Sequence, residues 1–249
     1  RYNTQYIQMV GLGSITDSLF SLKYNAFERN RYSMKEISEA LNNNFKDNEV
    51  MRQFFLNKTP RYGNDDDRVD NIARRVLNTC IEIVEGYPLT PVRKASRRVY
   101  GLPTTVHVYF GSVCGATPDG RYAGEPLSEG ISPVQGADRK GISSVFRTIG
   151  KLEHIKTGGT LLNQRLSPDL IQDGETLKKL AELMRAYFSM ETHHVQYNVV
   201  SSKLLKRAKE EPEKFRDLMV RVAGYSDYFV NLPVGLQDEI IARTEQGKD

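Results

Sequence analysis

RVAGYSDYFVNL, residues 221–232, places Gly224 inside an apolar run and directly before the aromatic residues Tyr225, Tyr228 and Phe229. A glycine within a helix interior costs about 1 kcal/mol relative to alanine, so an ordinary helix gains nothing from it. Glycine at a helix C-cap, or at a place where two backbones pack closely, is the common structural explanation. The aromatic neighbours suggest that the chain keeps this glycine for another reason, which the rest of the sequence must supply.

Composition and charge exclude several classes of protein. The chain has 249 residues, 39% of them hydrophobic and 27% charged, with a net charge of +4. These values are ordinary for a globular protein. The densest basic stretch, RKASRR (93–98), is typical of a solvated surface rather than a nucleic-acid-binding arm. No apolar run reaches the roughly 18 residues that a membrane span needs. We therefore expect no nucleic-acid or membrane partner.

The cysteines and the first residues indicate the setting of the chain. Cys80 and Cys114 are its two cysteines, and neither has a partner at metal-binding spacing. Such sparse cysteine use favours a reducing, cytoplasmic location. The chain starts at Arg1 and its opening lacks a helix cap, so we expect it to be the C-terminal piece of a longer polypeptide.

Helical and strand-like patterns alternate along the chain, which predicts an α/β fold. The capping-box pair Ser33 and Glu36 begins one helix. A longer one has Val69, Ile72, Val76, Cys80 and Ile83 on one stripe. That longer helix covers 65–86, and the remaining predicted elements are helices over 175–188, 211–222 and 234–244 and strands over 104–113 and 194–200.

Residues 111–159 are dense in glycine, proline, serine and aspartate, and PDGR (118–121) has the residue order of a tight turn. So long a loop-rich stretch inside a compact domain is unusual and predicts a functional or interface role.

Short polar motifs give little sign of conventional catalysis. GLG (11–13) lacks the third glycine of a nucleotide loop, and TGGT (157–160) is better explained by close backbone packing than by anion binding. GNDDD (63–67) does not have calcium-loop spacing and is better explained as a helix N-cap. The four histidines show no ligand spacing, and no nucleophile motif is present. We predict no metal site.

Several segments together resemble one family in the order of its motifs. RVAGYSDYF followed by LQDEIIARTEQ resembles the C-terminal signature of the glycyl radical enzymes, the family that includes pyruvate formate-lyase and anaerobic diol dehydratases. The further matching segments are KTPRYGNDDD (58–67), GATPDGRYAGEPLSEGISPVQG (115–136), TGGTLLNQR (157–165) and HHVQYNV (193–199). The resemblance therefore covers essentially the whole chain.

The resemblance implies a fold and a division of labour. The fold would be the C-terminal half of a ten-stranded glycyl radical enzyme α/β barrel plus the glycyl radical domain. Residues 1–125 would belong to the pyruvate formate-lyase-like barrel and residues 126–249 to the glycyl radical domain with its C-terminal helices. The resemblance also implies a homodimer and a partner activating enzyme, which holds S-adenosylmethionine and an iron–sulfur cluster and removes a hydrogen atom from Gly224. This chain itself would bind no metal or organic cofactor.

Radical storage explains the choice of glycine. An unpaired electron on an α-carbon is delocalised between the amide nitrogen and the carbonyl when the two peptide planes are nearly coplanar, and a Cβ would clash in that geometry. Gly224 is therefore the predicted catalytic residue. Arg221 and Tyr225 are predicted to support the radical loop, and Tyr225, Tyr228 and Phe229 to bury it away from water and dioxygen.

The reaction is implied only by finer resemblance. RYNTQYIQMVGLGSITDSL and HIKTGGTLLNQR resemble the branch that dehydrates trans-4-hydroxy-L-proline, close to the glycerol dehydratases, so we expect a lyase in anaerobic metabolism. Thr104, Thr105 and Arg243 are candidate substrate contacts. Neither Cys80 nor Cys114 matches the family's thiyl cysteine, which implies that this piece alone is inactive.

Other functions remain open at this stage. Within the family they are propanediol or glycerol dehydratase, choline lyase, formate C-acetyltransferase and arylacetate decarboxylase. A non-catalytic spare glycyl radical module is a further alternative, although such modules resemble only the last segment of the family. A scaffold that kept the fold without the chemistry would have lost the radical motif, which is intact here.

Overall fold

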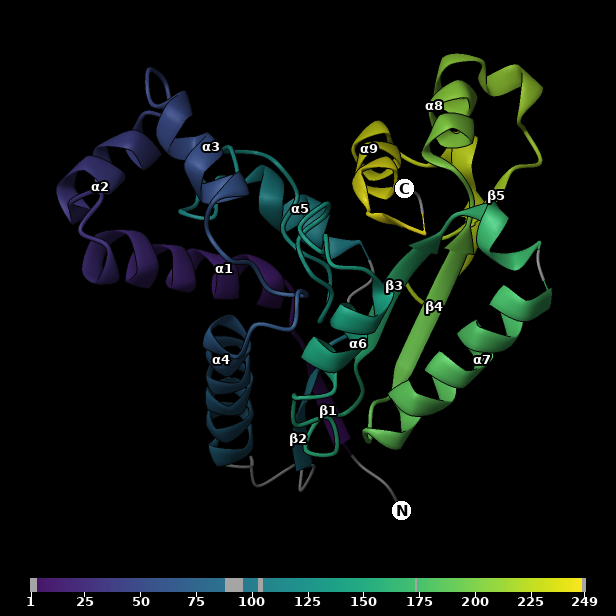
Figure 1. The fold of residues 1–249 in the computed structure, drawn as a ribbon, viewed down its shortest axis with the longest axis horizontal. Helices are drawn as coiled ribbons and strands as arrows, with labels where there is room; N and C mark the ends of the chain where they lie inside the picture. Colours follow the sequence, from purple (N-terminus) through teal and green to yellow (C-terminus); the bar gives the residue numbers. More distant parts are fainter. Residues whose placement is uncertain (1–3, 88–95, 103–104, 173, 248–249) are drawn as a thin grey trace.

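The computed structural model describes residues 4–87, 96–102, 105–172 and 174–247 and shows an α/β architecture (Figure 1). Its N-terminal part is mostly helical, with a short parallel pair of strands whose register runs from Thr4↔Ser96 to Gln8↔Tyr100. The elements of this part are β1 (Thr4–Gln8), α1 (Leu12–Leu22), a π-helical turn η1 (Lys23–Glu28), α2 (Met34–Asn42), α3 (Glu49–Asn57), α4 (Asp67–Gly86), β2 (Ser96–Tyr100) and α5 (Val106–Ser112).

The C-terminal part is built on a parallel sheet in the order β4-β3-β7. Its central strand β3 is buried at every residue, as expected for a strand covered on both faces. Helix α7 runs alongside this sheet next to β4. Helices α8 and α9 lie near the end of the sheet where β3 and β4 terminate (Figure 1). The elements are α6 (Ile142–Ile149), β3 (Leu161–Leu166), η2 (Pro168–Ile171), α7 (Gly174–Ser189), β4 (His194–Val199), α8 (Ser202–Glu210), η3 (Pro212–Lys214), β5 (Met219–Arg221), β6 (Ser226–Tyr228), η4 (Phe229–Asn231), α9 (Val234–Ala242) and β7 (Glu245–Gln246).

The predicted helix starts at Ser33 and in GNDDD are confirmed. The Ser33 hydroxyl accepts a hydrogen bond from the Glu36 N–H, and the Glu36 carboxylate accepts one from the Ser33 N–H. Asp66 caps α4 by accepting from the Arg68 N–H. The predicted stripe on α4 is displaced by one position, because the buried residues after Val69 are Ala73, Leu77 and Ile81, while Ile83 is exposed.

Two predicted elements are wrong. Residues 106–112 form helix α5 and not a strand, because His107 and Gly111, one helical turn apart, face the interior while Tyr109 and Phe110 are exposed. A short run rich in β-branched and aromatic residues fits both periods. The predicted helix over 211–222 is not formed: Pro212–Lys214 make a short 3-10 turn and residues 219–221 form strand β5, since Val220 and Val222 alternate inward with Arg221 between them.

Three apolar cores organise the described residues. The first lies under α1, α4 and α7, and the third lies between α2 and α3. The second joins β3, α8 and α9 to the β5–β6 hairpin, through buried residues that include Leu161, Leu205, Val220, Phe229 and Ile240. This second core fixes the base of the hairpin that carries Gly224.

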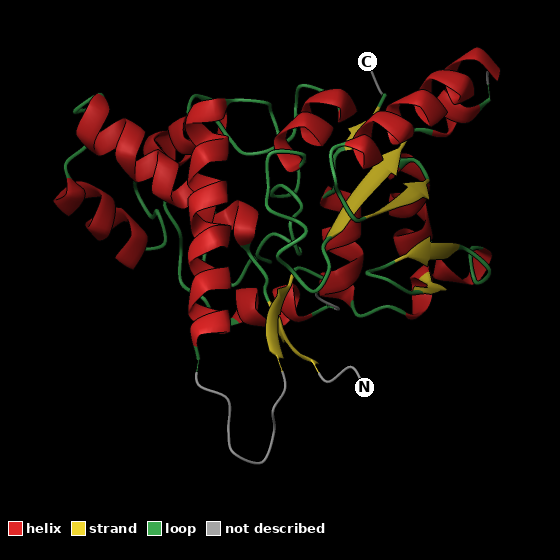
Figure 2. Ribbon diagram, turned by 90° about the horizontal axis from the view of Figure 1, so that it is seen from below, coloured by secondary structure: helices red, strands yellow, loops and turns green. Residues whose placement is uncertain are grey.

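The loop-rich segment lies in the middle of the molecule, between a helical side and the side with the three-stranded sheet (Figure 2). The predicted PDGR turn is confirmed by the Gly120 N–H, which donates to the Thr117 carbonyl over 3.0 Å. Close packing at TGGT is also confirmed, because a Cβ on Gly158 would lie 2.3 Å from the Tyr6 ring. No helix within the described ranges combines the length and the hydropathy needed to cross a bilayer.

Candidate active site around Gly224

Gly224 lies in the turn of the β5–β6 hairpin. The strands pair antiparallel from Met219↔Tyr228 to Arg221↔Ser226, and the Val222 N–H donates to the Tyr225 carbonyl over 2.8 Å to close the turn. We call residues 222–225 the Gly224 turn. Gly224 has φ +81°, a left-handed conformation that side-chain-bearing residues rarely adopt. An added Cβ would meet only Leu102 Cδ2, at 3.5 Å, so this turn requires glycine for its backbone conformation rather than for lack of space.

Side chains hold both polar groups of the Gly224 backbone. The Gly224 N–H donates to Oε1 of Gln196 over 2.9 Å, and Nη2 of Arg221 donates to the Gly224 carbonyl over 3.1 Å. Gln196 also donates to the Val222 carbonyl over 3.2 Å and accepts from Nε of Arg221 at 3.2 Å. One amide and one guanidinium therefore fix the peptide groups on the two sides of the Gly224 α-carbon.

Two further side chains tie the hairpin to the sheet and to α9. Asn198, two residues after Gln196 on β4, accepts from the Arg221 N–H over 2.7 Å and donates to the Arg221 carbonyl over 2.6 Å. Arg243, at the end of α9, donates to the Val222 carbonyl over 3.2 and 3.3 Å. The hairpin is thus tied to β4 by Asn198 and to the end of α9 by Arg243, while Gly224 itself is exposed in this chain.

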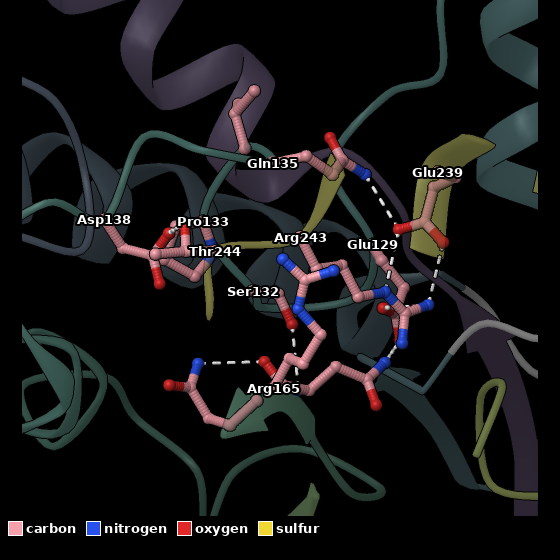
Figure 3. Close-up of a pocket in the computed structure, with 12 residues that line it drawn as sticks. Glu129, Ser132, Pro133, Gln135, Asp138, Arg165, Glu239, Arg243 and Thr244 are labelled. Atoms are coloured by element: carbon pink, nitrogen blue, oxygen red, sulfur yellow. Dashed lines mark hydrogen bonds and ion pairs between the residues drawn. The ribbon is translucent and has the colours of Figure 1, made fainter. Parts of the chain in front are cut away.

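A buried cluster of charged residues surrounds Arg243, which binds the Val222 carbonyl of the turn; Figure 3 shows Arg243 with Glu129, Gln135 and Glu239. The Arg243 guanidinium binds Glu239 through two hydrogen bonds of 3.0 and 2.8 Å and lies 3.4 Å from Glu129. Nε2 of His107, fully buried, is 3.6 Å from the Glu239 carboxylate. Gln135 donates to the same carboxylate over 3.0 Å. One guanidinium therefore pairs with two buried carboxyl groups.

Burial and pairing shift the pKa values of this cluster in opposite directions. Burial raises the pKa of Glu129 to about 7, although the Arg243 charge opposes that shift. Burial acts on Glu239 in the same sense, but Arg243 and His107 outweigh it and hold the pKa of Glu239 well below its ordinary range. Glu239 is thus the permanent anion of the pair, and Glu129 is the member that titrates near neutral pH.

The structure brings together three of the predicted site residues, Gly224, Arg221 and Tyr225, in one hairpin. Arg243 is buried, and its contacts among the described residues are Glu239, Glu129 and the Val222 carbonyl. Thr105 is half-buried and precedes α5, where its side chain makes no capping bond. Thr104 lies outside the described residues.

Of the three aromatic residues predicted to shelter Gly224, Phe229 is fully buried in the second core, whereas Tyr225 and Tyr228 are 39% and 42% exposed in this chain. Among the described residues, β6 pairs with β5 and with no other strand, which leaves these two side chains at the edge of the hairpin. Their role as a shelter stays a prediction. The residues that do contact the Gly224 peptides are polar side chains of β4 and β5.

Sequence reasoning missed Gln196, Asn198, Glu129 and Glu239. The first two had a detectable signal, because Gln196 and Asn198 alternate on a strand and therefore project from one face. Glu129 sits in a loop and Glu239 in a helix of mixed polarity, and neither position indicates burial.

Among the described residues, neither cysteine contacts the Gly224 turn. Cys80 is on α4 and packs against the first core, where burial raises the pKa of its thiol. Cys114 follows α5 and is half-buried. Within the described ranges, no three His, Cys, Asp or Glu side chains converge as a metal site would require.

Comparison with known proteins agrees with this geometry. A pyruvate formate lyase-like family model matches residues 1–111, and a glycine radical family model matches residues 127–230. The chain is 50% identical to trans-4-hydroxy-L-proline dehydratase of Clostridioides difficile over 246 residues, which cover 99% of this chain and 31% of that protein. It is 35% identical to isethionate sulfite-lyase of Bilophila wadsworthia, over 97% of this chain and 29% of that protein.

Solved structures show the same relationship. Hydroxyproline dehydratase from C. difficile, with trans-4-hydroxy-L-proline bound, superposes with a TM-score of 0.95 at 50% identity, over 99% of this chain and 31% of that one. The B12-independent glycerol dehydratase from Clostridium butyricum superposes with a TM-score of 0.93 at 41% identity, again over 99% and 31%.

These matches define a pyruvate formate lyase-like α/β segment followed by a glycine radical segment. The chain belongs to the glycyl radical enzymes, and the α/β fold class predicted from its sequence is confirmed. It spans a little under a third of the length of the relatives named above.

Proposed function

We propose that this chain is the C-terminal part of a glycyl radical dehydratase that stores its radical on Gly224 and acts on trans-4-hydroxy-L-proline. The observation that carries the storage role is the Gly224 turn: a glycine with an exposed α-carbon, whose N–H and carbonyl are each held by a side chain. The substrate follows from the 50% identity to a hydroxyproline dehydratase over nearly the whole chain.

The chemistry of Gly224 lies in its α C–H bond. Loss of that hydrogen atom leaves an electron shared between the amide nitrogen and the carbonyl, which requires the α-carbon and both peptides to become coplanar. The residue has φ +81° before that change, so its backbone must rotate. Glycine allows this rotation because no Cβ is carried through it, and the open space at the α-carbon accommodates it.

The radical would be installed by a radical S-adenosylmethionine activating enzyme, whose iron–sulfur cluster and cofactor supply the hydrogen abstraction. This chain provides the accessible glycine and binds no metal or organic cofactor of its own. The thiyl cysteine and its acid–base partner belong to the remainder of the enzyme, which dehydrates substrate by hydrogen-atom removal beside the hydroxyl-bearing carbon. The enzyme would be a cytoplasmic homodimer that acts in anaerobic metabolism.

Two further parts of the proposal concern this chain alone. Residues 1–125 contribute to the barrel and residues 126–249 form the glycyl radical domain. Thr104, Thr105 and Arg243 are candidate substrate contacts. Because Arg243 is buried and donates to the Val222 carbonyl, its influence on the substrate would be exerted through the Gly224 turn. Tyr225, beside Gly224 and partly exposed, would shield the turn once the rest of the enzyme covers it.

Dehydration of glycerol is the second candidate function, because the C. butyricum glycerol dehydratase superposes almost as closely. Turnover assays with trans-4-hydroxy-L-proline, glycerol, propanediol, choline and isethionate separate these reactions. We expect turnover of hydroxyproline at a rate well above the others, whereas preference for glycerol would replace the substrate and leave the storage role intact.

Paramagnetic resonance tests radical storage directly. The full-length enzyme is activated anaerobically with its activating enzyme, and we expect a doublet from the one remaining α-hydrogen of Gly224. Gly224→Ala should abolish both the doublet and turnover. Brief exposure to air should cut the activated wild-type chain at Gly224 and release a small C-terminal peptide. Turnover that survives the substitution would refute the proposal.

A further inference from the structure

We propose that Gln196 is the positioning residue of the Gly224 radical, as the last member of a hydrogen-bonded relay that runs from Glu129 through Asn163. This inference rests on radical storage at Gly224. Glu129 lies in the loop-rich segment, Asn163 on β3, and Gln196 is its partner in the parallel register of β4. All three side chains are buried, so the relay crosses the sheet without solvent contact.

The direction of every hydrogen bond in the relay is fixed. Nδ2 of Asn163 donates to Glu129, Nε2 of Gln196 donates to Oδ1 of Asn163, and the Gly224 N–H donates to Oε1 of Gln196 over 2.9 Å. A backbone N–H only donates, so the Gly224 N–H requires the oxygen of Gln196 to face it. Nε2 of Gln196 then donates to the Asn163 oxygen, and Nδ2 of Asn163 donates to Glu129, so the backbone end sets the orientation of both amides and each amide passes the same polarity onward.

This polarity suits an electron on the Gly224 α-carbon. An amide that donates to a carboxyl oxygen becomes a better acceptor at its own oxygen, because hydrogen bonds in a chain polarise one another. Gln196 thus accepts a stronger hydrogen bond from the Gly224 N–H, which makes that nitrogen a better electron donor. On the other side the Arg221 guanidinium donates to the Gly224 carbonyl and makes it a stronger acceptor. These are the two groups over which the unpaired electron spreads.

Gln196 also limits where the turn can move. It binds the N–H of Gly224 and the carbonyl of Val222, so it holds the chain on the N-terminal side of the α-carbon while the residue flattens. Gln196 acts through the backbone and contacts neither substrate nor activating enzyme in this proposal.

Asn198 supplies a matched control. It is an amide on the same face of β4, and it binds the N–H and the carbonyl of Arg221 and no atom of Gly224. If β4 only docks the hairpin, loss of either amide should have the same consequence. If Gln196 positions the radical, the two losses should differ in the spectrum of Gly224.

The experiment compares Gln196→Met with Asn198→Leu in the full-length, anaerobically activated enzyme. For Asn198→Leu we expect the wild-type doublet splitting. For Gln196→Met we expect an altered splitting and radical decay under argon faster by about tenfold, the factor that the loss of one ordinary hydrogen bond produces. Identical splitting and decay in the two variants would overturn the role of Gln196.

A second pair covers the case in which Gln196→Met fails to fold, as judged by circular dichroism. Gln196→Glu keeps an acceptor for the Gly224 N–H but replaces a neutral amide by a carboxylate, and Asn198→Asp makes the same change two residues away. We expect a shifted splitting in Gln196→Glu alone, and an unshifted one would overturn the proposal. A wild-type enzyme without any doublet would instead refute radical storage, so the two failures are distinguishable.

Discussion

Two glycine-bearing loops of this molecule use the residue for different reasons. A Cβ on Gly111, near the end of α5 where the loop-rich segment begins, would lie 2.3 Å from the Glu125 carbonyl oxygen of that segment, and one on Gly120 would lie 2.7 Å from Leu56. In the Gly224 turn the nearest atom to such a Cβ is 3.5 Å away. At Gly111 other atoms occupy the space that a Cβ would need, and Gly120 combines the same obstruction with a left-handed φ of +91°. The Gly224 turn has the space and keeps glycine for its backbone conformation and, we propose, for its C–H bond.

The two loops are also stabilised differently. The loop-rich segment is internally tied: Arg121 donates to the Thr117 hydroxyl over 3.1 Å and to the Glu125 carbonyl over 2.6 Å. The Gly224 turn depends on residues outside itself, through Gln196, Asn198 and Arg243. A packed loop is rigid by its own contacts, whereas an exposed turn that must change shape is better held at its edges.

Arg243 is the residue that links the two loops, since it contacts both Glu129 and the Val222 carbonyl. Arg243→Met should lower the free energy of unfolding by about 3–5 kcal/mol, because two buried carboxylates lose their counter-ion. Urea unfolding of the enzyme that carries this chain measures the change.

Lys209→Met is the control for that substitution. Lys209 on α8 forms an ion pair with Asp238 on α9, the helix that Arg243 follows, but this pair lies on the surface. Its loss should change the free energy of unfolding by about 1 kcal/mol or less. Equal effects of the two substitutions would show that burial of the Arg243 cluster does not matter for stability.

Asp138 ties the loop-rich segment to the C-terminal strand, since its carboxylate accepts from Thr244 and, over 2.8 Å, from Gln246. Burial raises its pKa from 3.8 to about 6, and the hydrogen bond from Thr244 opposes the shift only in part. The unfolded chain loses this proton near pH 4 and the folded chain near pH 6, so the contribution of Asp138 to stability is present below pH 4 and lost as the pH rises to 6.

Asp138→Asn removes this titration. The difference in unfolding free energy between wild type and variant should therefore change by up to about 3 kcal/mol between pH 4 and pH 6, with the wild type losing stability relative to the variant. Urea unfolding at a series of pH values checks the sign. A difference that stays constant over this range would mean that Asp138 ionises in the folded state as it does in the unfolded one.

Gly111→Ala tests the packed loop. The methyl group would collide with the Glu125 carbonyl and with the Pro126 α-carbon at 2.7 Å, and both are backbone atoms that move only with the loop. We expect a loss of about 1–3 kcal/mol in unfolding free energy, the usual range for overpacking. Gly86→Ala is the matched control, because no atom lies within 4 Å of its Cβ position. No loss in Gly111→Ala would mean that this loop yields easily.

The sequence alone predicted the α/β class and the long helices, because helices have a local signature in a 3.6-residue period and caps such as Asp66. The radical role of Gly224 comes from a family motif and stays a prediction. It failed for α5 and β5, whose few residues fit both helical and strand periods, so their packing partners decided the outcome. The Glu129–Asn163–Gln196 relay was beyond prediction, since its members are 33 and 34 residues apart and meet only through the parallel register of β3 and β4.

The last prediction separates the chemical role of glycine from its structural one. Gly224→Ala adds a methyl group that meets only Leu102, so the cost is confined to placing alanine at φ +81°. We expect a loss of about 1–2 kcal/mol in unfolding free energy, because that is the cost of a left-handed conformation for an L-residue. The same variant should lose the radical signal completely. If urea unfolding instead showed a loss well above about 3 kcal/mol, the upper end of the range for overpacking, glycine would be needed here for packing, and an inactive Gly224→Ala enzyme would no longer argue for radical storage.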